Sequence, residues 1–250
     1  MRKLKQLASR MTIPRIAVLT GAGVSAASGV PTFRDAGGLW RQYSPQELAT
    51  PEAFHRDPRL VWEFYDWRRQ RVAGCVPNAA HLALAEMDAT VPDFILATQN
   101  IDGLHPAAGS RRILFLHGDI WRLRCTSCRY RAESRQVPLD PLPPLCPDCG
   151  AVLRPDVVWF GEALDGLVLN RASQAFAQAD IALVVGTSAL VYPAAELPLL
   201  TRQRGGKVYE FNTEATPLSP LATQSFLGLC EETLPAWWAG FRQSYLTAGA

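Results

Sequence analysis

Two C-x-x-C pairs constrain the fold of this 250-residue chain more than any other feature. Seventeen residues separate the pairs, which consist of Cys125, Cys128, Cys146 and Cys149. This spacing is typical of a zinc ribbon, and four thiolates complete a tetrahedral zinc site with no open position. We therefore predict one structural zinc ion. Two redox-active pairs are the alternative, but both lie in a segment rich in turn residues rather than at a strand-to-helix junction.

Composition excludes several classes of protein. With 48% hydrophobic and 19% charged residues the chain is typical of a globular protein, and its net charge of +2 indicates no polyanionic partner. No apolar run reaches the roughly 18 residues that span a membrane. A zinc ribbon can bind nucleic acid, but no aromatic stacking platform interleaves the nearby basic residues, so we consider that partner unlikely; these residues are Arg122, Arg124, Arg129, Arg131 and Arg135.

The N-terminal segment is basic, since Lys3, Lys5, Arg10 and Arg15 precede the first acidic residue, Asp35. This pattern superficially resembles a transit peptide, but no apolar signal core or small-residue cleavage site follows it. We expect a short helix at the start of a cytoplasmic protein.

Apolar runs rich in β-branched residues alternate with helical patterns along the chain. The runs predict buried strands at 16–20, 94–98, 113–116, 181–186 and 208–211. Helices are predicted at 78–87, 164–179 and 193–204. This alternation favours an α/β fold with a doubly wound, Rossmann-like parallel sheet.

Two segments interrupt the alternation. Residues 31–76 contain no convincing strand but do contain a helix signalled by Asp57 as N-cap and Pro58 in its first turn. Residues 120–155 carry the cysteines and a proline-rich loop. We expect both insertions to form a smaller domain, a helical module plus a zinc ribbon, beside a large domain formed by residues 1–30, 77–119 and 156–250.

A glycine-rich turn follows the first predicted strand. Its G-x-G-x-x-A pattern allows the backbone to approach a pyrophosphate at the N-terminus of the next helix. A turn between a strand and a helix needs no ligand, so the pattern alone is weak. The nucleotide-binding candidates in this turn are Gly21, Ala22, Gly23 and Ser25.

The acidic residue that closes the second strand of an ordinary dinucleotide-binding dehydrogenase is absent. Contacts to a ribose would then come from later strand ends, where ligands of open α/β sheets gather. Two polar segments follow apolar strands and are our candidates: Gly186, Thr187 and Ser188, and Asn212, Thr213 and Glu214.

Several short motifs follow one another along the chain. They are GAGVS at 21–25, PTFR at 31–34, TQNID at 98–102, LHG at 116–118, the four cysteines, VWFGE at 158–162 and GTS at 186–188. Taken in this order over roughly residues 13–235, they resemble the sirtuin family. The match looks most similar to the subgroup of bacterial and mitochondrial deacylases that accept acidic acyl chains. Ala27 and Asp35 depart from the pattern of many sirtuins but only flank key residues.

The resemblance implies an enzyme that consumes NAD as a cosubstrate. It would remove acetyl and acidic acyl groups from lysines of proteins or peptides, releasing nicotinamide and O-acyl-ADP-ribose. We expect a monomer without a membrane partner. A mono-ADP-ribosyltransferase on the same fold and a zinc-ribbon binding protein are the alternatives.

The resemblance also implies roles for particular residues. His117, which ends an apolar strand, would be the general base, and its near-neutral pKa suits that task. Asn100 and Asp102 lie two apart, so both can face one side; without the resemblance, such residues usually only form a turn. For His55, His81 and His105 we expect structural roles. The remaining residues that would contact NAD are Thr32, Phe33, Arg34, Trp40, Gln99, Ile101 and, through its backbone, Cys230.

Tyr65 and Arg68 lie three residues apart on the helix that begins at Pro58, so they share one face. A guanidinium can bind a carboxylate bidentately, and a tyrosine hydroxyl adds a donor. In the similar sirtuins this pair binds succinyl or malonyl chains. The alternative is that Arg68, Arg69 and Arg71 form a basic helix surface.

Substrate peptides would add as a strand beside the predicted cleft, which is flanked by residues 159–162 and 189–192. The candidate contacts are Val158, Phe160, Gly161 and Val191.

Overall fold

A computed structural model describes residues 13–31 and 43–245 of the chain. Its main sheet has six parallel strands in the order β3-β2-β1-β7-β8-β9. Numbered along the chain, this is the doubly wound order 3-2-1-4-5-6, which reverses direction between β1 and β7. The α/β prediction is confirmed, and all five predicted strands are present. The strands are β1 (Ile16–Thr20), β2 (Phe94–Thr98), β3 (Ile113–Phe115), β7 (Ile181–Val185), β8 (Lys207–Asn212) and β9 (Gln224–Leu227).

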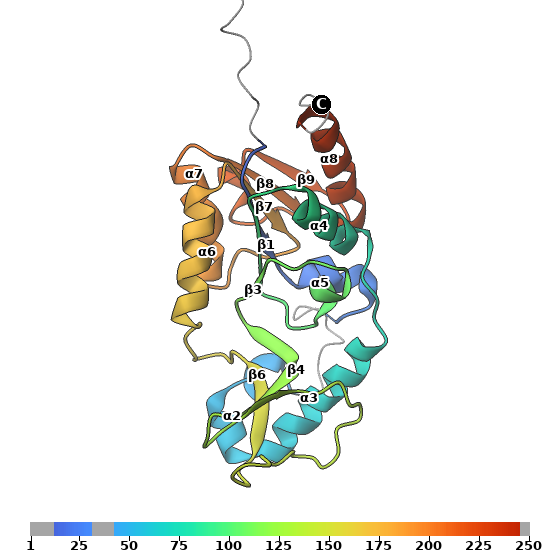
Figure 1. The fold of residues 1–250 in the computed structure, drawn as a ribbon, viewed down its shortest axis with the longest axis vertical. Coiled ribbons are helices and arrows are strands. Elements are labelled where there is room, and N and C mark those ends of the chain that lie inside the picture. Colours follow the sequence, from blue (N-terminus) through green and yellow to red (C-terminus); the bar gives the residue numbers. More distant parts are fainter. Residues whose placement is uncertain (1–12, 32–42, 246–250) are drawn as a thin grey trace, which may run out of the picture.

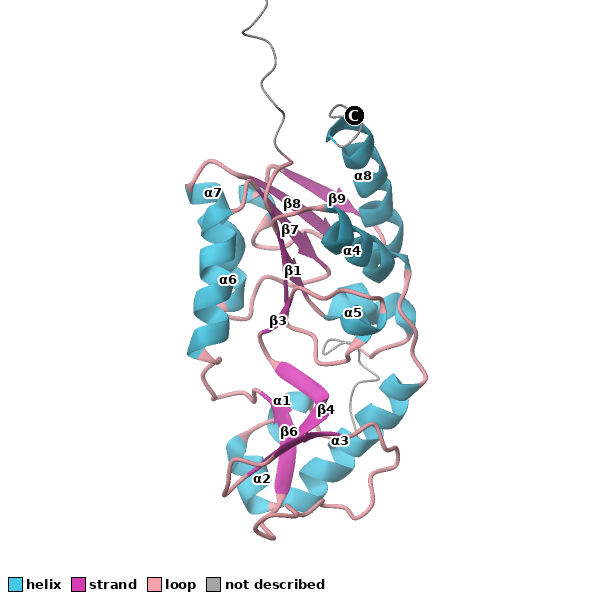
Figure 2. Cartoon of the chain, in the orientation of Figure 1, coloured by secondary structure: helices cyan, strands magenta, loops and turns pink. Residues whose placement is uncertain are grey.

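Helices cover both faces of this sheet (Figures 1 and 2). Alternate side chains of β1 point to opposite faces: Ile16 and Val18 pack in one apolar cluster, Ala17 and Leu19 in another. Helices α4 (Ala79–Thr90) and α8 (Cys230–Tyr245) enclose the first cluster, while α6 (Gly166–Gln178) and α7 (Leu197–Gln203) enclose the second. The sheet is therefore buried on both sides, which leaves its strand ends for ligands.

The helices that precede β2 and β7 were predicted within a few residues. The predicted helix at 193–204 is instead divided into a short 3-10 helix, η3 (Ala194–Glu196), and α7. The remaining short elements of the large sheet's connections are η1 (Ala22–Ser28), α5 (Leu104–Ala107) and η4 (Ser219–Leu221).

A second, antiparallel sheet lies at the other end of the molecule (Figure 1). Its strands, in the order β5-β4-β6, pack with three helices around an apolar cluster that contains Trp62, Phe64 and Trp121. The elements of this zinc-ribbon module are β4 (Gly118–Cys125), β5 (Arg131–Glu133), β6 (Leu153–Val157), α1 (Pro45–Leu48), α2 (Pro51–Arg56) and α3 (Pro58–Ala73).

The three strands of this smaller sheet were not predicted. In β4 the residues Trp121, Leu123 and Cys125 are buried while Arg122 is exposed, which is the alternation of a half-buried strand. The zinc-ribbon spacing gives no strand bounds, whereas the period of two in β4 is the signal for this strand.

The start of α3 follows the prediction in detail. Asp57 is the N-cap, and its Oδ1 accepts the Leu60 backbone N–H at 3.0 Å, with Pro58 in the first turn. This capping fixes the register of the helix and hence the direction of its arginines.

Several predictions lie outside the described residues: the N-terminal helix, with Lys3, Lys5 and Arg10, and the loop with Thr32, Phe33, Arg34 and Trp40. Among the residues that the structure describes, no helix combines the length and apolarity needed to cross a membrane.

Candidate functional site

The glycine-rich turn lies where the strand order reverses, against the end of β7. Gly21 N–H donates to the Val185 carbonyl at 3.0 Å and Gly23 N–H donates to the Gly186 carbonyl at 2.8 Å. A Cβ added to Gly186, whose φ is +61°, would lie 2.2 Å from the Val24 nitrogen. These glycines therefore serve first to bring two strand ends into backbone contact.

The glycine-rich pattern itself forms the 3-10 helix η1, so a helix does follow β1, as the fingerprint predicts. Gly29 closes it in the left-handed region at φ 85°. Its seven residues place Ser25 on the inner side, fully buried. The turn thus delivers a buried hydroxyl as well as a close backbone.

Ser25 joins the two polar residues that follow β2. Its Oγ donates to Asp102 Oδ2 at 2.8 Å and accepts from Asn100 Nδ2 at 3.2 Å. Asn100 also donates to the Gly21 carbonyl at 3.0 Å, and the Leu104 backbone N–H donates to Asp102 Oδ1. Burial raises the pKa of the Asp102 carboxyl, and these hydrogen bonds oppose that shift. Asn100 and Asp102 do face the same side, as their spacing predicts.

Two histidines support this cluster from behind, and sequence analysis did not connect them to it. His81 Nε2 lies 3.3 Å from Ser25 Oγ, and His105 Nε2 lies 2.9 Å from Thr20 Oγ1. Burial lowers the pKa of His81 to about 4 and that of His105 well below its usual value, so both rings are neutral at neutral pH. The only local signal was the capping box that His81 forms with Asn78.

His117 lies between β3 and β4, where the two sheets meet along the chain. Its Nδ1 is 3.0 Å from the Gln99 carbonyl oxygen, which can only accept. Nδ1 therefore carries the proton, and Nε2 has a free lone pair. Burial lowers the pKa of His117 from 6.5, and the bond to Gln99 opposes the shift. The half-buried ring is thus a neutral base at neutral pH.

The ends of β2, β7 and β8 are tied together by amide side chains. Gln99 Nε2 donates to Thr187 Oγ1 at 2.9 Å, and Asn212 Nδ2 donates to the Thr187 carbonyl at 2.9 Å. Ile101 and Ser188 are partly exposed beside this edge, and Thr213 and Glu214 are exposed.

Cys230 begins α8 behind β8, and its thiol donates to the Phe211 carbonyl at 3.5 Å. Burial raises the pKa of this thiol to about 11, so it stays protonated. This agrees with the expectation that the thiol itself is incidental.

Tyr65 and Arg68 both point inward from α3, with exposed fractions of 3% and 7%. The Tyr65 hydroxyl accepts a hydrogen bond from Trp159 Nε1 at 2.9 Å, and Arg68 lies 5.9 Å from the Phe64 ring centroid. Burial raises the pKa of Tyr65 to about 12 and lowers that of Arg68. The alternative of a basic helix surface is wrong for Arg68 and for Arg69, which is completely buried.

The predicted peptide-binding segments expose apolar side chains, since Phe160 is 44% and Val191 41% exposed. The Val158 and Phe160 backbone N–H groups are already engaged, with the His117 and Ala49 carbonyls at 2.9 Å each. A peptide strand would therefore have to pair with other backbone groups here, near the exposed Gly161.

The four cysteines of the zinc-ribbon module form one cluster, whose sulfur atoms all lie within 4.8 Å of one another. The Cys125–Cys149 and Cys128–Cys146 sulfur pairs are 3.5 and 3.6 Å apart. Zinc bonds of about 2.3 Å to four sulfurs place the sulfurs about 3.8 Å apart, so the cluster fits tetrahedral zinc. Backbone N–H groups of Ser127 and Cys128 donate to Cys125 Sγ, as expected for a thiolate ligand.

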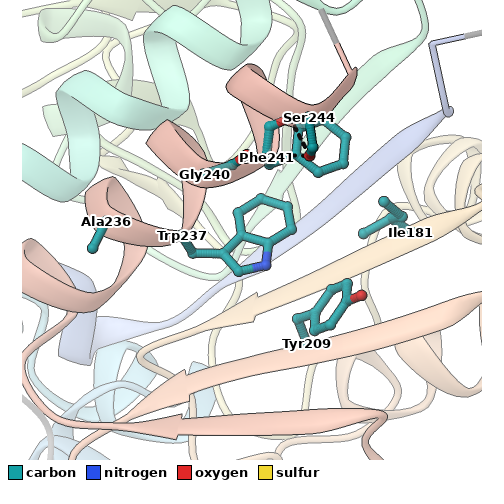
Figure 3. A pocket seen from close by; sticks show the side chains of 7 residues that line it. All are labelled: Ile181, Tyr209, Ala236, Trp237, Gly240, Phe241 and Ser244. Carbon is teal, nitrogen blue, oxygen red and sulfur yellow. Dashed lines mark hydrogen bonds between the residues drawn. The ribbon is translucent and has the colours of Figure 1, made fainter. Parts of the chain in front are cut away.

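A separate pocket, drawn in Figure 3, lies between the sheet and α8 and is lined by Tyr209, Trp237 and Phe241. Its residue Ile181 starts β7, whereas the candidate site lies at the opposite end of that strand. The pocket is therefore no part of the candidate site.

Comparison with known proteins agrees with this geometry. The model of the Sir2 family matches residues 21–193. An "NAD-dependent protein deacylase" of Aquifex aeolicus is 47% identical over 94% of this chain and 98% of its own length. One of Pyrococcus furiosus is 51% identical over 86% and 88%.

Solved structures are similar as well. A Sir2 homologue in complex with NAD has a TM-score of 0.87 and 47% identity, covering 92% of this chain and 90% of its own. A Sir2 protein with a deacetylated p53 peptide and 3′-O-acetyl ADP-ribose has a TM-score of 0.77 and 33% identity, covering 92% and 93%. With this similarity along nearly its whole length, the chain belongs to the Sir2 family.

Proposed function

We propose that this protein is an NAD-dependent protein-lysine deacylase. With bound NAD, acyl-lysine and water it forms lysine, nicotinamide and O-acyl-ADP-ribose. One observation carries the proposal. A basic nitrogen, His117 Nε2, and the buried polar cluster of Ser25, Asn100 and Asp102 lie at the same edge of the sheet, where ligands of doubly wound sheets bind. The relatives named NAD-dependent protein deacylases support it.

The chain's own residues have distinct roles in this proposal. His117 Nε2 accepts a proton from a ribose hydroxyl of the cosubstrate, since the Gln99 carbonyl fixes its tautomer. Asn100 orients the ribose or a water, and Asp102 accepts from the nicotinamide amide. Ser25 holds both side chains in register. Bound NAD would supply the ribose carbon that the acyl oxygen attacks as nicotinamide leaves, and the ribose hydroxyl oxygen that carries the acyl group in the product.

The finer proposal concerns the acyl group: the enzyme removes succinyl or malonyl as well as acetyl groups. Tyr65 and Arg68 provide a neutral hydroxyl and a guanidinium on one face of α3, both shielded from water. A carboxylate bound there exchanges its hydration for a charge-assisted pair in a low-dielectric site. An acetyl group lacks the terminal carboxylate that these two donors would bind.

We also propose the division of the chain made from the sequence, with a helical and zinc-binding domain at 31–76 and 120–155. One apolar cluster drawn largely from these segments supports it. The four-cysteine cluster would hold structural zinc because it leaves no ligand position open. A monomeric state and a cytoplasmic location stay predictions.

One assay tests the function. The protein is incubated with NAD and an acetyl- or succinyl-lysine peptide, and mass spectrometry follows nicotinamide, free lysine and O-acyl-ADP-ribose. We expect all three products from both peptides. ADP-ribosylated protein without deacylated peptide would instead favour the transferase alternative, and no nicotinamide would favour a binding protein. Removal of acetyl without succinyl would leave the deacylase proposal intact and overturn the acidic-acyl proposal.

A further inference from the structure

The Tyr65 hydroxyl is oriented by a second aromatic residue. Trp159 Nε1 donates to Tyr65 Oη at 2.9 Å, and the two residues are only 3% exposed each. An indole N–H can only donate, so the phenol oxygen must accept. The single Tyr65 proton then points away from Trp159 and stays available to a ligand. Since the pKa of Tyr65 is about 12, that proton is present throughout the physiological range.

The Trp159 indole packs against a charged and an aromatic side chain. The Arg154 guanidinium carbon lies 3.3 Å from the Trp159 ring centroid, and Phe54 packs at 5.1 Å. Glu162 binds Arg154 through both carboxylate oxygens, at 2.6 and 2.8 Å, and accepts the Trp159 backbone N–H at 2.9 Å. These contacts hold the indole with its N–H directed at Tyr65.

Charge adds to this geometry. A guanidinium against the face of an indole withdraws electron density from the ring, and hydrogen bonds in a chain polarise one another in a low-dielectric interior. An N–H donated to the phenol oxygen makes the phenol O–H a stronger donor. A negatively charged acyl chain gains from that, and a neutral acetyl group does not.

We propose that Trp159 is a positioning residue for acyl specificity: its indole N–H orients the Tyr65 hydroxyl toward an acyl carboxylate. Trp159 would act through the Tyr65 hydroxyl, to which its only polar side-chain atom, the indole N–H, already donates. The inference rests on the proposed acidic-acyl function. It adds a third residue, from the loop after β6, to the pair formed by Tyr65 and Arg68.

The test compares kcat/KM for succinyl- and acetyl-lysine versions of one peptide in the purified full chain. Trp159→Phe keeps an aromatic ring and removes the N–H. A net buried hydrogen bond corresponds to about a threefold to tenfold effect, so we expect the succinyl-to-acetyl ratio to fall about that much, mostly through KM for the succinyl peptide.

Tyr65→Phe removes the hydroxyl and completes a double-mutant cycle. We expect Trp159→Phe to leave the ratio unchanged in the Tyr65→Phe background, because no hydroxyl remains to be oriented. Trp62→Phe is the matched control. Trp62 lies in α3, as Tyr65 does, its side chain is buried like that of Trp159, and its Nε1 donates to the Leu153 carbonyl at 2.7 Å. It should lower the melting temperature without changing the ratio.

The outcomes are distinct. A wild-type protein that removes succinyl, with a ratio that Trp159→Phe does not change, would overturn this inference alone. The same holds if Trp159→Phe lowers the ratio equally with and without the Tyr65 hydroxyl, or if Trp62→Phe lowers it as much. A wild-type protein that removes only acetyl groups would overturn the acidic-acyl proposal and this inference together.

Discussion

Helix α3 carries two consecutive buried arginines whose surroundings differ. The Arg69 guanidinium donates to the backbone carbonyls of Ile120, Ser134 and Gln136, at 2.8, 2.7 and 3.1 Å, and lies 5.0 Å from the Trp121 ring centroid. Arg68 lies with Tyr65 and Phe64 on the side that adjoins Trp159. One turn of α3 thus presents one arginine to β4 and the loop after β5, and the next arginine to the proposed acyl site.

The two buried arginines should therefore serve different purposes, Arg69 the stability of the fold and Arg68 the choice of acyl group. Three backbone carbonyls accept hydrogen bonds from Arg69, and two of these carbonyls belong to the segment between the cysteine pairs. Its charge therefore serves to join α3 to that segment. Arg68 instead lies beside Phe64, and the charges of Tyr65 and Asp102 influence its pKa. Substitutions should separate the two faces cleanly.

Removal of zinc should have the largest effect, because it releases the segment that binds Arg69. Metal binding to four-ligand ribbons contributes on the order of 10 kcal/mol to folding. We expect the zinc-ribbon module to unfold on chelation or in Cys146→Ser, with a large fall in melting temperature measured by calorimetry alongside metal content. Cys75→Ser, outside the cluster, is the control. Unchanged melting after verified metal loss would contradict a structural site.

Arg69→Met should come next, and should act on stability. The substitution leaves one buried and two partly buried carbonyls without their charged donor, at a cost of about 3 kcal/mol. Denaturant unfolding measures it. The succinyl-to-acetyl ratio of the folded fraction should match that of the wild type. A changed ratio at normal stability would show that the two faces of α3 are not independent.

The comparison also shows what the sequence can predict. The zinc site depends on four residues at short, fixed spacing, so it was recognisable before any fold was known. The capped start of α3 and the parallel sheet were likewise local patterns. The direction of the Arg69 side chain was not predictable from the sequence. Its partners lie in β4 and in the loop after β5, and neither strand was predicted. His81 contacts Ser25 from 56 residues away, a distance over which no periodicity informs.

Arg68→Met should change specificity rather than stability. Loss of a buried charged partner for the acyl carboxylate costs about 2–5 kcal/mol, so we expect kcat/KM for succinyl-lysine to fall at least about 30-fold. Deacetylation should fall far less, since an acetyl group carries no charge. Steady-state kinetics on matched peptides provides the measurement. Equal losses on both substrates, or none, would remove Arg68 from the acyl site.

The smallest effects concern pH, where the proposed base and the acyl site should behave differently. Burial lowers the pKa of His117 from 6.5. Because the neutral ring is the active form, activity persists below 6.5 and is lost only as the pH falls through the lowered pKa. We therefore expect kcat/KM for both substrates to fall over the same acidic pH range. The hydrogen bond from His117 to the Gln99 carbonyl opposes the lowering of the His117 pKa.

The acyl site should add no pH dependence of its own. Tyr65, with a pKa of about 12, keeps its proton, and a succinyl carboxylate is ionised above about pH 5.5. Burial lowers the pKa of Arg68, whereas Tyr65 and Asp102 act to raise it, and an arginine guanidinium stays protonated in proteins. The succinyl-to-acetyl ratio should therefore be constant from about pH 6 to about pH 9. A ratio that declines toward alkaline pH would contradict this prediction. If the decline disappeared in Arg68→Met, the Arg68 guanidinium would be the group that loses its proton in this range.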